Sequence, residues 1–157
     1  MNLRQPWQSY RQVSTQTASP GQLVLMLFDG AIRFLDRALE GFELEDPVEF
    51  NQTISNNILR GQSIVQELNN SLDLDRGGEL ALTLRRLYEY MDDRLMESNM
   101  RKKPDGIRDT IRRLTTLRDA WQQMLCQRAT PASVSAPVVR DSVFGAAYGS
   151  LGLCACG

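Results

Sequence analysis

The sequence contains no histidine among its 157 residues, and this absence limits the chemistry that the chain can perform. Histidine is the commonest general base and the usual partner of a nucleophilic serine or cysteine. It also supplies metal ligands in the di-iron enzymes that are built inside helical bundles. The phosphate-binding patterns G-x-x-x-x-G-K-[ST] and G-x-G-x-x-G are missing as well. We therefore expect a protein that is not an enzyme.

Cysteine is scarce and falls late in the chain, at Cys126, Cys154 and Cys156. A structural zinc site needs about four ligands, which three cysteines without histidine do not supply. The spacing of the three cysteines does not form a disulfide framework either. We expect no bound metal ion and no cofactor.

Net charge and long apolar runs are also lacking. The formal net charge is -1, and the arginines lie among acidic residues, as in RLYEYMDDR. Such a surface provides no basic field for a nucleic acid backbone. No segment approaches the roughly 18 consecutive apolar residues that read as a membrane span. The polar start MNLRQPWQSYRQ does not resemble a signal peptide, so we expect a cytoplasmic protein that contacts neither nucleic acid nor membrane.

Four stretches of the chain show the apolar period of an amphipathic helix. The first begins at Ser19, where Pro20 and Gln22 complete a capping box with proline at the first helical position. Asp46 and Pro47 start a second helix over about 47–70 in the same way. The pair Gly77-Gly78 is expected as a turn before a third helix over about 79–100, and Asp105 is expected as the cap of the fourth.

Short links between four helices predict an all-α fold, an antiparallel four-helix bundle over residues 19–128. Residues 1–18 form a short N-terminal arm whose Trp7, Tyr10 and Val13 favour docking on the bundle. Residues 129–157 are rich in Ala, Ser, Gly and Pro, which predicts a mostly disordered, flexible tail. Within that tail, the stretch VFGAAYGSLGL is apolar enough to associate with another surface.

The helices carry more apolar residues than a bundle core requires. In the third helix a core stripe runs through Leu80, Leu84, Leu87, Tyr88, Met91 and Leu95, and a sparser stripe of Leu82, Met96 and Met100 lies roughly opposite. Leu59 lies nearly opposite the core face of the second helix. Surplus apolar surface predicts a groove for a partner helix. The alternative is that each of these residues is core or singly exposed.

Several segments resemble the flagellar secretion chaperone FliS family. The segment YRQVSTQTASPGQLVLMLFDGAIRFLDRA is similar to the family's N-terminal signature, with a Tyr in the arm, A-S-P-x-x-L and L-[FY]-D-G-A. The segment GGELALTLRRLYEYMDDRLMESNM is similar to its Gly-Gly turn and L-Y-x-Y-M helix, and LRDAW matches near the end of the fourth helix. The resemblance covers about residues 7–125, and the tail has no counterpart in the family pattern.

The resemblance implies a cytoplasmic export chaperone. Such proteins bind the disordered C-terminal segment of flagellin, prevent its premature polymerisation and keep it competent for flagellar type III secretion. The flagellar export apparatus and other flagellar chaperones are further candidate partners, whereas the anti-sigma factor that some members bind is not carried over. The resemblance places flagellin binding at Tyr10, Ile64, Leu68, Leu87, Tyr90 and Met91. The alternative is a helical-bundle module for oligomerisation or for another protein partner.

Overall fold

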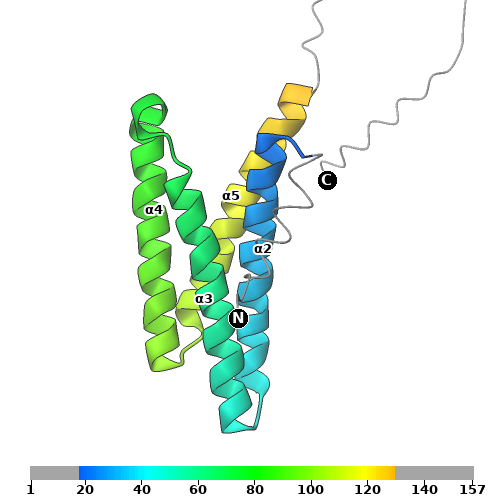
Figure 1. The fold of residues 1–157 in the computed structure, drawn as a ribbon, viewed down its shortest axis with the longest axis vertical. Helices are drawn as coiled ribbons and strands as arrows, with labels where there is room; N and C mark the ends of the chain where they lie inside the picture. The colour runs from blue at the N-terminus through cyan, green and yellow to red at the C-terminus, as the bar shows by residue number, and fades with distance from the viewer. Residues whose placement is uncertain (1–17, 130–157) are drawn as a thin grey trace, which may run out of the picture.

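The computed structural model describes residues 18–129, in which four α-helices form an antiparallel bundle (Figure 1). They are α2 (Pro20–Glu40), α3 (Pro47–Asn70), α4 (Leu74–Arg101) and α5 (Asp105–Ala129), and a 3-10 turn η1 (Gly41–Glu43) follows α2. None of the described residues forms a strand. The predicted all-α bundle is confirmed, while the predicted arm and tail lie outside the described residues apart from Ala18 and Ala129.

The first two helices begin at the predicted caps. Ser19 Oγ accepts a hydrogen bond from the Gln22 amide at 3.3 Å, and Gln22 Oε1 accepts one from the Ser19 amide at 2.9 Å. Asp46 Oδ1 accepts from the amides of Val48 and Glu49 at 2.8 and 2.9 Å. These bonds satisfy amides that have no partner within the helix, and each cap contributes about 0.5–2 kcal/mol.

The two later helix starts differ from the prediction. Helix α4 begins at Leu74, and Asp73 caps it by accepting from the Arg76 amide at 3.0 Å. The chain then kinks at Gly78, which has φ 53° and ψ -137°, a conformation that favours glycine. The predicted turn is therefore a kink inside a helical segment. The sequence predicts Asp105 as a cap, but Asp105 is the first residue of α5, where its charge suits the helix dipole.

Each helix packs against two others, so that α2 contacts α3 and α5, and α4 contacts α3 and α5. Helices α2 and α3 approach closely because Gly61 leaves room for Leu35, whose Cδ2 lies 2.8 Å from where a Cβ at Gly61 would be. The central core consists of Phe28, Ala31, Leu35, Ala38, Ile54, Ile58, Ile64, Val65, Leu68, Tyr88, Met91, Leu95, Ile107 and Leu114.

Among residues 18–129, no helix is both long enough and apolar enough to cross a membrane. Within the same part of the chain, no group of three or more His, Cys, Asp and Glu side chains could hold a metal ion.

Candidate functional site

Helices α4 and α5 are closest beside the loop that joins them. Gly106 of α5 lies against the backbone carbonyl of Arg94 and the hydroxyl of Ser98 on α4, and a Cβ at this position would overlap both. Ser98 and Gly106 are both buried. The missing side chain at Gly106 therefore allows the two backbones to meet, and we call this the closed end of the α4–α5 pair.

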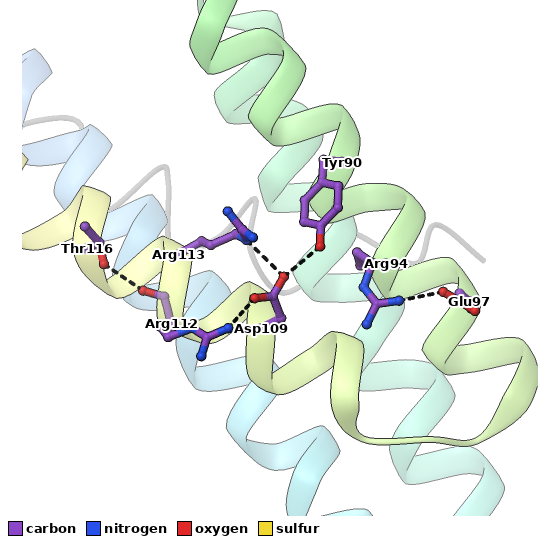
Figure 2. A network of polar contacts seen from close by, with 7 residues as sticks. All are labelled: Tyr90, Arg94, Glu97, Asp109, Arg112, Arg113 and Thr116. Carbon is purple, nitrogen blue, oxygen red and sulfur yellow. Dashed lines mark hydrogen bonds and ion pairs between the residues drawn. The ribbon is translucent and has the colours of Figure 1, made fainter.

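One turn further along α5, a polar network crosses between the same two helices (Figure 2). The Tyr90 hydroxyl on α4 donates a hydrogen bond to Asp109 Oδ2 at 3.1 Å. Arg113 Nε donates to the same oxygen at 2.9 Å, and Arg112 Nη2 donates to Oδ1 at 2.6 Å. The Arg113 guanidinium also lies over the Tyr90 ring, 4.7 Å from its centroid.

Asp109 is the centre of this network, and its electrostatics follow from the contacts. The hydrogen bond from Arg113, supported by those from Arg112 and Tyr90, lowers the pKa of Asp109 to about 2, against the opposing effect of burial. A carboxylate that accepts several charge-assisted bonds stays ionised. The network therefore fixes α4 against α5 at this level and leaves no free acid for catalysis.

Beyond the network the two helices diverge, with α4 and α5 separating toward the end of the bundle at the top of Figure 1. On α4, Leu80 continues the stripe of Leu84 and Leu87 toward buried Met91, yet Leu80 is 69% exposed. An apolar residue on the inward stripe is exposed only where the opposite helix does not cover it. The core stripe is thus only partly covered at this end, and Leu80 is its exposed member.

The facing stripe of α5 is only half-buried. Residues Gly106 and Arg113 contact α4, and Leu117 and Met124 follow them at spacings that keep to the same side of the helix. Leu117, Trp121 and Met124 are all half-buried, as are Leu84 and Leu87 on α4. We define the open face as Leu80, Leu84, Leu87, Leu117, Trp121 and Met124.

The separation has a physical cause in where each helix is tied. Near its C-terminal end α5 is bound to α2, because Arg118 Nε pairs with Asp29 Oδ1 at 2.9 Å and Trp121 Nε1 donates to the Gly21 carbonyl at 2.8 Å. Helix α4 packs against α3, and at the level of the network Gln62 Nε2 donates to Asp92 Oδ1 at 3.0 Å. Each helix of the pair therefore follows a different neighbour as it leaves the closed end.

The open face is suited to binding a peptide rather than to chemistry. Its members are leucine, tryptophan and methionine, so it offers apolar contacts and, through Met124, an adaptable side chain. The residues recur at helical spacings of three, four and seven, which is how a groove receives an amphipathic helix. Exposed apolar surface of this kind makes the open face the candidate site for a protein partner.

The structure separates the residues that the resemblance assigned to flagellin binding. Ile64, Leu68 and Met91 are buried in the core. Leu87 belongs to the open face, and Tyr90, 41% exposed, lies at its inner edge in the Asp109 network. Tyr10 lies outside the described residues. Only Leu87 and Tyr90 therefore reach the surface at a common place.

The sequence pattern placed most of the open face in core stripes, because a stripe looks the same whether or not another helix covers it. One feature of α5 does indicate the opening. Small residues, Gly106 and Thr110, occupy the inward side near the loop, and large ones, Leu117 and Trp121, occupy it further on. Interhelical distance depends on the side chains at the contact, so this taper favours divergence.

The outer stripe of α4 was correctly placed. Leu82, Met96 and Met100 are all exposed, and so is Leu59 on α3. These residues point away from the core, and among them Leu82 is 45% exposed. On α4, Leu82, Met96 and Met100 lie on the far side of the helix from the core stripe, and Leu82 provides a control position for tests of the open face.

Comparison with known proteins identifies the relationship. Residues 3–128 match the family model described as flagellar protein FliS. The chain belongs to the FliS family. It is 34% identical over 125 residues to the flagellar secretion chaperone FliS of Bacillus subtilis, covering 80% of this chain and 90% of that protein. It is 38% identical over 120 residues to the flagellar secretion chaperone FliS of Salmonella typhimurium, covering 74% of this chain and 87% of that protein.

The FliS match includes the whole open face and the Asp109 network, since both lie between residues 3 and 128. The tail is different, because the matched region ends at residue 128 and residues 129–157 lie beyond it. Family membership thus accounts for the helical bundle and its surface, and it leaves the apolar stretch of the tail unexplained.

Proposed function

We propose that this chain is a cytoplasmic export chaperone that holds the C-terminal segment of flagellin on the open face. By doing so it prevents premature polymerisation and keeps the subunit competent for flagellar type III secretion. Membership of the FliS family supports the chaperone role. The observation that carries the choice of surface is Leu80, a leucine on the inward stripe of α4 that is 69% exposed.

The energetics favour such a surface for a client that folds on binding. Ordering a disordered segment consumes part of the interaction energy, so the interface must bury much apolar area. Covering one leucine or aromatic side chain completely contributes about 1.5–3 kcal/mol. The open face has six large apolar side chains that are half-buried or exposed, so a helical client gains contacts there without unfolding the bundle.

We propose different roles for the six residues that the resemblance assigned to flagellin binding. Leu87 contacts the client directly, and Tyr90 borders it. Ile64, Leu68 and Met91 support the surface from within the core. For Tyr10 the proposal rests on the resemblance alone, by which the arm covers part of the client's surface until the client arrives.

The test is isothermal titration of the full chain with a peptide covering the last ~40 residues of flagellin from the same organism, a length that suits an interface formed by coupled folding. We expect one-to-one binding with a large negative heat-capacity change. If the folded, monomeric protein does not bind the peptide, the chaperone proposal fails. A client-free dimer that persists on dilution would instead support the oligomerisation module.

A matched pair of variants tests the surface. Leu80→Glu places a charge in the open face, and Leu82→Glu places the same charge on the far side of the same helix. Both leucines are exposed, so both variants should fold. We expect Leu80→Glu to weaken peptide binding at least tenfold, about 1.4 kcal/mol, and Leu82→Glu to bind like the wild type. Equal affinity for the two variants would exclude the open face as the site.

A further inference from the structure

The tail carries an apolar stretch that lies beyond the region matching the FliS family model, which ends at residue 128. After Asp141 the sequence SVFGAAYGSLGLCACG contains no charged residue. Phe144, Tyr148 and Leu151 within it recur at spacings of four and three, the spacing of anchors on one side of a helix. The open face is equally without charge, since it consists of leucine, tryptophan and methionine. The tail stretch and the open face are therefore both apolar and uncharged, which suits them to contact each other.

The tail also begins near the open face. Helix α5 ends at Ala129, at the end of the bundle where α4 and α5 have separated (Figure 1). Trp121 lies eight residues before Ala129 on the same helix, about 12 Å away at 1.5 Å per residue. Residues 130–143 precede Phe144 and span up to roughly 45 Å when extended. The linking residues are therefore longer than the distance that Phe144, Tyr148 and Leu151 must cover to reach the open face.

We propose that residues 143–153 fold back onto the open face of their own molecule. The contact needs little intrinsic affinity, because a short tether gives an effective concentration in the millimolar range. Gly145, Gly149 and Gly152 oppose ordering of the segment as a helix, because glycine loses more backbone freedom on ordering than any other residue. The tail is accordingly a weak occupant that an incoming segment with better anchors displaces.

This contact has a consequence for client binding, and that consequence rests on the proposed function. If the tail covers the open face most of the time, the apparent affinity for the client falls by the fraction of molecules left open. Removing the anchors would raise the affinity. The contact itself is independent of any client and can be tested without one.

The first experiment uses Trp121 as a reporter within the full chain. The chain has two tryptophans, so a Trp7→Phe background leaves Trp121 alone. In this background we compare Phe144→Ser/Tyr148→Ser/Leu151→Ser with the control Val138→Ser/Val139→Ser, which changes apolar tail residues outside the stretch. We expect the triple variant to show about twofold stronger acrylamide quenching and a red-shifted emission, and the control to match the parent.

A change on the bundle should have the same effect as the change on the tail. Leu80→Glu in the Trp7→Phe background should increase quenching of Trp121, and Leu82→Glu should leave it unchanged. Unchanged quenching in the triple tail variant would overturn the proposal. So would an effect that disappears on dilution, because the occupant would then be the tail of a second molecule.

The flagellin peptide separates this proposal from the proposed function. We expect the triple tail variant to bind the peptide three- to tenfold more tightly than the parent. If neither protein binds the peptide while the difference in Trp121 quenching persists, the proposed function fails and the tail contact stands. If both bind the peptide equally and quenching is also equal, the tail contact fails and the proposed function stands.

Discussion

At the scale of single residues, Asp109 and Gly106 determine how α4 meets α5. The Asp109 side chain is only 13% exposed, and its carboxylate accepts hydrogen bonds from side chains of both helices. Gly106 is buried where the two backbones touch. Asp109 acts through its charge and Gly106 through the absence of a side chain. Substitution of Asp109 should therefore change the pH dependence of stability, whereas substitution of Gly106 should lower stability through steric overlap.

Replacing Asp109 with asparagine should remove a pH-dependent part of the stability. The unfolded chain titrates Asp109 near its ordinary pKa of about 4, and the folded chain titrates it at about 2. The stabilisation is therefore complete above about pH 4 and is lost as the pH falls toward 2. Allowing for solvent screening at the exposed arginines, we expect a loss of about 1 kcal/mol at pH 7.

Urea denaturation at pH 7 and at pH 2.5 measures this contribution. The deficit of Asp109→Asn relative to the wild type should shrink at the lower pH. The control is Asp119→Asn, which removes a carboxylate that pairs with Arg118 on the surface. A deficit that is the same at both pH values would show that the loss comes from packing and not from ionisation.

Replacing Gly106 with alanine should destabilise the bundle even though alanine favours helix. The new methyl group would overlap the Arg94 carbonyl and the Ser98 hydroxyl, and overpacking of this kind costs about 1–3 kcal/mol. The control is Gly30→Ala, where the added Cβ lies 3.4 Å from Ile64 Cδ1. Thermal melting should show a lower Tm for Gly106→Ala and an unchanged or higher one for Gly30→Ala. A Tm for Gly106→Ala at or above that of the wild type would contradict the close approach.

At the scale of the helices, local sequence determines where the first two begin. Ser19 with Gln22, and Asp46 with Pro47, bind the free amides of their own helices, so no distant contact is needed. The start of α4 escaped prediction because Gly77-Gly78 looks like a turn in sequence. In the structure, Asp73 caps a helical turn before the kink at Gly78.

Replacing Asp46 with alanine should destabilise α3 by about 0.5–2 kcal/mol, because the amides of Val48 and Glu49 lose their acceptor. Asp46→Asn keeps an oxygen at the same position and should recover most of that loss. Chemical denaturation followed by circular dichroism measures both variants. If alanine and asparagine are equally damaging, the side-chain oxygen is not what stabilises the helix start.

At the scale of the whole molecule, stability should decrease from the closed end of the α4–α5 pair toward the open face. Regions with few buried apolar contacts open at lower free energy and exchange their amide hydrogens sooner. Hydrogen exchange measured by mass spectrometry should show the weakest helical protection in 79–87 and 117–129, and stronger protection in α2 and α3. Adding the flagellin peptide should raise protection in those two segments first. Uniform protection along α4 and α5 would contradict the open end.

The sequence by itself determined the helical class, the two capped helix starts, the outer stripe of α4 and the resemblance to the FliS family. Each of these depends on neighbours within a few turns or on a string of residues in order. Within the predicted core stripe of α4, only the tertiary structure decided that Met91 is covered and Leu80 is exposed, and it buried Ile64 and Leu68, which the resemblance had assigned to flagellin binding. An apolar stripe has the same period whether it is covered or not. Coverage depends on Gly106, which lets α4 and α5 meet, and on the packing of α5 against α2 further along the helix.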